Sequence, residues 1–308
     1  MCYDERAMLR KALLNIYDTP DPLRPGFTTP GYDRDHARRT AAIVVAVAPR
    51  LGVAPEWLER LETAALLHDL GRAGMDPSLF GAIFRAAAEA GLPVRLGELR
   101  ERCPEADGSG AVDRFLEMAG AALARANIAV TDAVRDHVAM RMDYRGRLTR
   151  MIERHAATLA RLRVVVEPWM EKVVLYYYYP HLMEGEPAQV RRMGMLLVAC
   201  ENFEAANNAK RGRDYYGRSE ETMAGAFDPL RSFEDRGILD RETVRALACT
   251  AASGALDTVV QEARGNPTRT PLPADERALL HTLCTDLANP VGTDRGHGEP
   301  PVAIEHVG

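Results

Sequence analysis

The chain has 308 residues, of which 46% are hydrophobic and 27% are charged. This is the mixture of a globular protein, and it excludes a disordered or collagen-like chain. The formal net charge of -5 argues against a broad basic face for nucleic-acid polymers or anionic membranes. The N-terminus lacks the pattern of a secretory leader, and no apolar run reaches the roughly 20 residues of a membrane helix. We therefore expect a cytoplasmic protein in which the five cysteines are reduced.

Apolar residues recur at helical spacing along almost the whole chain, and the alternating pattern of strands is nearly absent. The sequence therefore predicts an all-α protein. The predicted helices cover residues 36–51, 55–71, two or three segments within 78–144, and residues 148–166, 188–208, 219–263 and 274–288. Residues 289–308 are rich in proline and glycine and are predicted to form a loose tail.

Four predicted helices each carry an ionisable residue at a position where a core residue is expected. His36 begins one apolar stripe, His68 ends the next with Asp69 beside it, and His155 and Glu201 lie within two others. A single buried histidine is more often structural than a metal ligand. Four helices that each direct such a group inward favour a metal site, because helical bundles build metal sites from facing helices. Nitrogen combined with carboxylate oxygen suits Fe, Mn, Zn or Co.

The stretch HDLGRAGMDP begins at His68, and His36 lies upstream of it. Together they resemble the HD superfamily of metal-dependent phosphohydrolases, and more narrowly its HD-GYP group, whose members hydrolyse cyclic di-GMP. The segment RGRLTRMIERHAATL resembles the HD-GYP sequence segment that carries the next metal-binding histidine of that group. The segment LLVACENFEAANNAKRGRDYYGR resembles the HD-GYP segment that carries the last metal-binding aspartate. The resemblance implies that His36, His68, Asp69, His155 and Glu201 bind one or two divalent transition-metal ions, Fe or Mn.

The resemblance also implies a fold: an HD-domain helical bundle with a helical insertion and a loose C-terminal tail. Residues 1–31 are then an N-terminal helix and linker. Residues 32–263 form the HD-GYP-like domain, with the insertion at about 78–147, and residues 264–308 form a short helix and the tail. Glu204 falls on a second acid of the last family segment.

The sequence departs from the HD-GYP pattern at YYYYPHLMEGEP, which replaces a block with two metal-binding histidines and the GYP signature. His181 is a candidate replacement ligand, because it shares a helical face with Glu184. The run Tyr176–Tyr179 has three interpretations: ordinary packing aromatics, a surface that stacks on a purine base, or side chains that fill the emptied metal position. Arg72 replaces the family lysine and could bind a phosphate by two parallel hydrogen bonds.

These observations favour a metal-dependent phosphohydrolase of the HD superfamily that acts on a nucleotide phosphoester, with cyclic di-GMP as one candidate. Catalysis is expected to involve Asp69 and Arg72. The candidate substrate-binding residues are Arg72, Tyr176, Tyr177, Arg213 and Arg218. The alternative is a catalytically impaired HD-GYP-like protein that binds a nucleotide or a protein partner as a signalling module. A homodimer is compatible with either interpretation.

Overall fold

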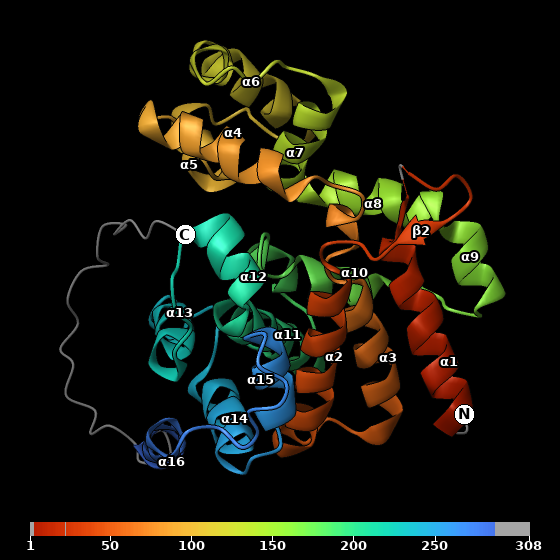
Figure 1. Cartoon of the computed structure of the whole chain (residues 1–308), viewed down its shortest axis with the longest axis vertical. Helices are drawn as coiled ribbons and strands as arrows, with labels where there is room; N and C mark the ends of the chain where they lie inside the picture. Colours follow the sequence, from red (N-terminus) through yellow and green to blue (C-terminus); the bar gives the residue numbers. More distant parts are fainter. Residues whose placement is uncertain (1–2, 22, 287–308) are drawn as a thin grey trace.

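A computed structural model describes residues 3–21 and 23–286 (Figure 1). The described chain is all-α, as predicted, apart from one short antiparallel pair between β1 (Thr19–Pro20) and β2 (Thr28–Thr29). The tail predicted for residues 289–308 lies outside the described residues, as does Cys2. None of the described helices is both long enough and apolar enough to cross a membrane.

The main bundle is built around α11 (Ala188–Asn207), whose buried residues point in all directions around the helix. It packs against α2 (Arg34–Val47), which also packs against α3 (Pro55–Leu67). Helices α10 (Pro168–Leu175) and α13 (Met223–Asp235) contact other faces of α11. Helix α2, which carries His36, and helix α3, which ends just before His68, are therefore held in the middle of the molecule.

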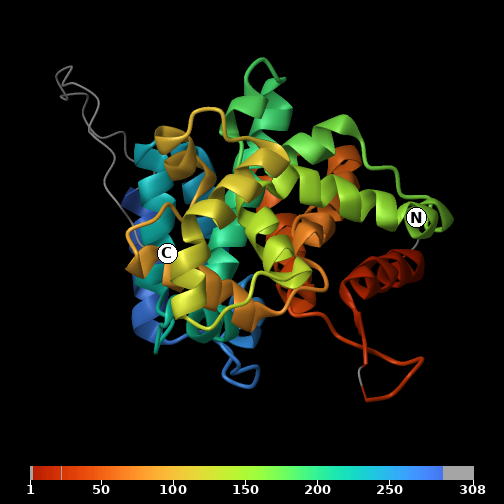
Figure 2. The same cartoon turned by 90° about the horizontal axis from the view of Figure 1, so that it is seen from above.

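The other helices of the main bundle surround this centre. Helices α1 and α16 lie on opposite sides of the molecule in both views (Figures 1 and 2). These outer α-helices are α1 (Tyr3–Leu14), α8 (Tyr144–Arg154), α9 (Ala156–Arg161), α12 (Ala209–Arg211), α14 (Arg241–Ala252), α15 (Asp257–Ala263) and α16 (Ala274–Asp286). Short 3-10 turns and one π-helical turn connect them: η1 (Asn15–Tyr17), η2 (Ala48–Leu51), η3 (Leu70–Arg72), η4 (Pro180–Met183) and the π turn η5 (Gly212–Tyr216).

A second hydrophobic core lies within the predicted insertion. Helices α4 (Pro77–Glu89), α5 (Leu96–Arg102), α6 (Gly108–Arg125) and α7 (Asp132–Met142) group at one end of the molecule (Figure 1). Their buried side chains, such as Phe115, form a cluster separate from the main core. The insertion therefore packs largely on itself and meets the bundle mainly through α8 and the start of α4.

One prediction about a helix is wrong, and the structure divides a second predicted helical region into separate helices. The helix expected over residues 148–166 divides at His155 into α8 and α9, and α9 buries only Leu159, so no continuous apolar stripe holds it against the core. The helical region expected over 219–263 is divided into α13, α14 and α15. Gly237 and Gly254 follow the first two of these helices with positive φ, the backbone conformation that commonly ends a helix.

The expectation of uniformly reduced cysteines is also corrected. Cys249 of α14 and Cys284 of α16 form a disulfide, and each is half-buried. Cys103 and Cys200 are free and buried. The disulfide links α16, the last described helix, to α14 of the main bundle. Helix α16 also packs against α14 and α13.

Candidate metal centre

Local structure explains how the HD sequence places its side chains. His36 lies in the first turn of α2, and His68 follows the last residue of α3. Asp69 comes next, immediately before the tight turn η3, and the Tyr144 hydroxyl of α8 donates a hydrogen bond to the His68 carbonyl oxygen. A Cβ atom on Gly71 would lie 2.7 Å from the Tyr144 ring, so this turn needs a glycine for α8 to approach.

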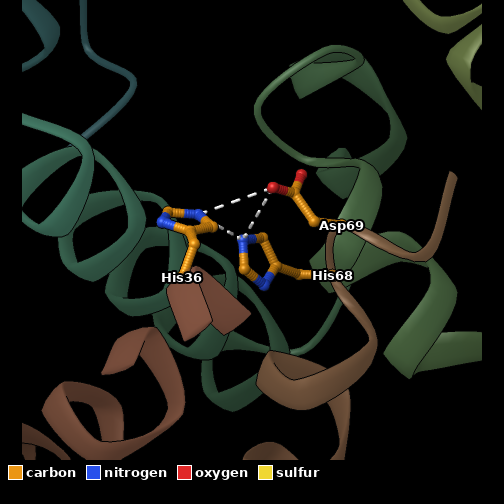
Figure 3. A group of neighbouring side chains, drawn as sticks. All are labelled: His36, His68 and Asp69. Atoms are coloured by element: carbon orange, nitrogen blue, oxygen red, sulfur yellow. Dashed lines mark hydrogen bonds and ion pairs between the residues drawn. The ribbon is translucent and has the colours of Figure 1, made fainter. Parts of the chain in front are cut away.

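The three side chains point toward one another from two packed helices (Figure 3). His36, His68 and Asp69 are all at least 97% buried. The two Nε2 atoms are 3.1 Å apart, and Asp69 Oδ2 lies 3.5 Å from His36 Nε2 and 3.9 Å from His68 Nε2. Among the described residues, the ligand atoms that cluster within 4.8 Å of one another belong to these three.

The other ring nitrogen of each histidine is engaged in a way that leaves Nε2 with a lone pair. His68 Nδ1 donates to the carbonyl oxygen of Ala65 at 2.7 Å, and His36 Nδ1 donates to the carboxylate of Glu204. Burial lowers the pKa of His36 to about 4, so its ring is neutral at neutral pH. Two nitrogen lone pairs and a carboxylate oxygen therefore face one another, and such a group is stabilised by a cation.

The spacing of these atoms fits a first-row transition metal. Metal–nitrogen and metal–oxygen bonds of about 2.1 Å place neighbouring ligand atoms about 3.0 Å apart in octahedral and about 3.4 Å apart in tetrahedral geometry. Two of the observed separations, 3.1 and 3.5 Å, are close to these values, and the third, 3.9 Å between Asp69 Oδ2 and His68 Nε2, is longer. The residues present thus fit a divalent metal with three protein ligands.

Glu204 of α11 holds His36 and is itself held by two further donors. Arg39 Nε donates to Glu204 Oε1 at 2.6 Å, and the Asn208 side chain donates to both carboxylate oxygens. Burial alone would raise the pKa of Glu204, but His36 and Arg39 lower it to about 2. Glu204 is therefore ionised, and it fixes both the tautomer and the ring orientation of His36.

Glu201 lies one turn before Glu204 on α11, but its oxygens are outside the three-residue cluster. Burial raises its pKa, while His68 lowers it and Asp69 raises it. These effects place Glu201 near the cluster as a neighbouring carboxyl group. Of the two acids on this helix, the structure gives the direct contact with a histidine to Glu204.

Two arginines and a second aspartate lie beside Asp69. Arg211 of α12 donates to Asp33 and to Asp69 Oδ2, and it is 4% exposed. Arg72 Nε lies 3.3 Å from Asp33 Oδ2 and 3.6 Å from Asp69 Oδ2. Burial alone would raise the pKa of Asp69, but Arg211 and the neighbouring histidines and Arg72 hold it well below its ordinary value. The structure thus places Arg72 beside the candidate ligands.

The structure does not bring His155 and His181 into the cluster. His155 is half-buried at the junction of α8 and α9, and burial lowers its pKa. His181 lies exposed in η4, where its ring is near that of Tyr179. Because the helix around His155 is interrupted and η4 is a surface turn, neither side chain is directed to α2 and α3.

The tyrosine that lies near the candidate metal centre is Tyr178, and not the predicted Tyr176 or Tyr177. Tyr176 is buried with its hydroxyl bound to the Ile238 carbonyl oxygen, and Tyr177 packs against Phe233. Tyr178 instead stacks on Tyr144 with ring centroids 4.4 Å apart. Burial raises the pKa of Tyr178, Arg72 lowers it, and Glu201 and Asp69 raise it further, which places this hydroxyl beside the site.

The predicted phosphate contacts Arg213 and Arg218 also lie elsewhere. Arg213 is exposed and pairs with Asp214, whereas Arg218 donates to the Ala205 carbonyl oxygen at 2.8 Å. Arg211 is the member of this basic stretch that reaches Asp69. A basic run predicts a cation near the end of α11, but not which member turns inward.

Comparison with known proteins agrees with this geometry. Residues 34–92 match the HD domain family. The matched stretch runs from α2 to just beyond α4, and it contains His36, His68, Asp69 and Arg72. No curated protein and no solved structure matches the chain. The match and the His–His–Asp cluster together show that residues 34–92 are similar to the HD domains of a superfamily of metal-dependent phosphohydrolases.

Proposed function

We propose that the protein is a phosphohydrolase that uses one divalent transition metal, Fe or Mn, held by His36, His68 and Asp69. The observation that carries this proposal is the convergence of two Nε2 lone pairs and a carboxylate oxygen in a buried cluster. A metal in this position would polarise a phosphoryl oxygen and lower the pKa of a bound water. With His155 and His181 outside the cluster, one ion is proposed rather than two.

The chain's own residues have separate roles in this proposal. Glu204 orients His36, and Arg39 and Asn208 hold Glu204 in place. Arg72 and Arg211 supply positive charge next to the metal ligands, where the phosphate of a substrate would be bound. Both guanidiniums remain charged at all physiological pH values, so they bind and orient the phosphate and transfer no proton.

Metal content tests this proposal directly. We expect the purified full-length protein to contain about one first-row transition metal per chain by elemental analysis, because structural and catalytic sites of this kind bind metal tightly. The double variant His68→Ala, Asp69→Ala should lose it. The matched control is His155→Ala, which removes a histidine outside the cluster and should retain the metal. A metal content that is unchanged in the double variant would contradict the assigned ligands.

The nature of the substrate is a finer part of the proposal. The likeness of residues 145–159 and 196–218 to HD-GYP segments supports cyclic di-GMP as one nucleotide substrate and a role in signalling. Turnover should therefore be measured with Mn or Fe(II) against cyclic di-GMP, nucleoside monophosphates and a chromogenic phosphodiester. Hydrolysis of any of these that depends on His68 and Asp69 supports the phosphohydrolase assignment.

One observation favours a second function. Asp69 Oδ2, the oxygen that faces both histidines, also accepts a hydrogen bond from Arg211. If that ion pair persists when metal is present, Asp69 is a weaker ligand, and the site would bind a phosphorylated ligand without turnover. Bound metal or nucleotide without hydrolysis of any substrate in the panel would support this binding module over the enzyme.

A further inference from the structure

Asp33 is used in an unusual way for the residue that precedes a helix. It occupies the N-cap position of α2, where an aspartate normally accepts a hydrogen bond from the first helical turn, but its side chain makes no such bond. Its two oxygens instead face two guanidiniums: Oδ1 accepts from Arg211, and Oδ2 lies 3.3 Å from Arg72 Nε. Asp33 is a buried residue, with 4% of its surface exposed.

The two arginines retain features of a site for a larger anion. Arg211 Nε is buried and has no hydrogen-bond partner among the described residues. Arg72 is positioned by its surroundings, because its guanidinium lies 5.1 Å from the Tyr215 ring centroid and 5.4 Å from that of Phe80. A carboxylate offers two oxygens to these cations, whereas a terminal phosphate offers three oxygens and more negative charge.

A cavity of about 240 Å³ adjoins this ion-pair cluster. Asp33 and Arg72 are part of its wall, together with Tyr17, Tyr32 and the exposed Lys210, whose Nζ lies 4.0 Å from the centroid of the Tyr32 ring. Its volume is below the range of about 300 to 1,000 Å³ typical of pockets for drug-sized ligands. The cavity therefore suits the body of a small molecule whose anionic end reaches Arg72.

We propose that Asp33 is an intramolecular stand-in for the phosphate of a small phosphorylated ligand. In the free protein its carboxylate keeps Arg72 and Arg211 in place, and the terminal phosphate of the ligand replaces it while the rest of the ligand occupies the adjoining cavity. The displaced carboxylate has another partner available, because the N–H groups of Asp35 and His36 in the first turn of α2 are within the reach of an N-cap side chain. This inference rests on the proposed function for the identity of the ligand as a phosphoester.

Competition by Asp33 predicts that removing its charge strengthens phosphate binding. Titration calorimetry with inorganic phosphate on the metal-free, full-length protein should show about tenfold tighter binding to Asp33→Asn than to the parent, since charge-assisted hydrogen bonds to two arginines are released. Asparagine is also a good N-cap residue, so the start of α2 is preserved. The gain should disappear when Arg211→Gln is added to Asp33→Asn.

The matched control is Asp214→Asn. Asp214 accepts a hydrogen bond from the Tyr32 hydroxyl at 2.9 Å, so this variant removes one negative charge near the same cavity without contacting Arg72 or Arg211. Its phosphate affinity should stay within about twofold of the parent, because the charge of Asp214 is already paired with the exposed Arg213. Equal gains in Asp33→Asn and Asp214→Asn, or no gain in either, would overturn the proposal.

A second variant covers the case in which Asp33→Asn does not fold. Asp33→Ser keeps an N-cap side chain and should show the same gain; an affinity equal to that of the parent would overturn the proposal.

The phosphate titration also separates this inference from the proposed phosphohydrolase function. Tighter phosphate binding without metal or turnover would support the stand-in and contradict the phosphohydrolase, whereas metal-dependent turnover without tighter binding would do the reverse.

Discussion

Glu204 shows how much a metal ligand depends on a residue that need not touch the metal. It contacts His36 directly and receives hydrogen bonds from Arg39 and Asn208, and its side chain is completely buried. Groups that orient a metal-binding histidine typically change metal affinity by about 10- to 100-fold when they are removed. The position of His36 is thus set by α11 as well as by its own helix.

We expect Glu204→Gln to weaken metal binding by at least about tenfold, because a neutral amide holds the His36 tautomer less firmly than a carboxylate. Competition with a chromogenic chelator measures the affinity. Glu201→Gln is the matched control: it makes the same chemical change one turn earlier on α11, outside the cluster, and should have a smaller effect. A loss that is equal or greater in Glu201→Gln would mean that Glu201, and not Glu204, is the acid that supports the site.

Among the elements, α7 carries a buried titratable group that is separate from the candidate metal centre. His137 is 2% exposed, and its Nδ1 has no hydrogen-bond partner among the described residues. Burial, followed by the nearby Arg147, lowers the pKa of His137 to about 4. The folded protein therefore keeps this ring neutral over a pH range in which the unfolded chain protonates it.

The sign of the pH dependence follows from this difference. Between the ordinary histidine pKa of about 6.5 and the folded value of about 4, the unfolded state binds more protons, so stability falls as the pH falls. We expect His137 to account for about 1 to 2 kcal/mol of lost unfolding free energy between about pH 8 and pH 5, after an allowance for solvent screening. Urea denaturation at the two pH values measures the loss.

The variant His137→Gln isolates this contribution, because glutamine does not titrate. Between about pH 8 and pH 5, the variant should lose about 1 to 2 kcal/mol less unfolding free energy than the parent loses. Other buried histidines, including His36, titrate in both proteins and cancel in the comparison. An identical pH dependence in the two proteins would contradict the assignment.

Periodicity in the sequence predicted the elements that carry the site better than it predicted the contacts between them. The ranges expected around α2, α3 and α11 agree with the structure, because each helix has a continuous buried face or is buried all round. The structure also brings His36, His68 and Asp69 together. The stripe through His155 failed because apolar spacing does not show whether another helix lies opposite.

The residues that the sequence did not single out reach the site over long separations. Arg211 pairs with Asp69 across 142 positions and with Asp33 across 178. Only one of several neighbouring basic residues turns inward, and this choice depends on how the chain bends after α11. Similarly, Tyr178 was one of four equivalent tyrosines until the short turn after α10 set their directions.

At the scale of the whole molecule, the disulfide between Cys249 and Cys284 closes a loop with a sequence separation of 35. Cross-linking a loop of this length restricts the unfolded chain and stabilises the fold by about 2 to 4 kcal/mol. We expect dithiothreitol, or the double variant Cys249→Ser, Cys284→Ser, to lower the unfolding free energy by this amount. Chemical denaturation with and without the reductant measures the change.

The double variant also serves as the control for the reductant. Dithiothreitol should have no further effect on it, because the remaining described cysteines, Cys103 and Cys200, are free. Mass spectrometry of the parent under non-reducing conditions should show the loss of two hydrogens relative to the reduced chain. A parent whose stability is unaffected by reduction would show that the disulfide does not restrain the folded protein.

The separation along the chain of the site's parts has a consequence for the order in which they assemble. His36 and His68 are 32 positions apart, whereas His36 and Glu204 are 168 apart. Closing the longer loop costs about 1.5 kcal/mol more chain entropy than closing the shorter one, and distant contacts tend to form later in folding. The two histidines can therefore meet while α2 and α3 pair, before α11 docks and fixes the ring of His36. We therefore expect a folding chain to bring the two nitrogen ligands together before it gains the carboxylate that orients one of them.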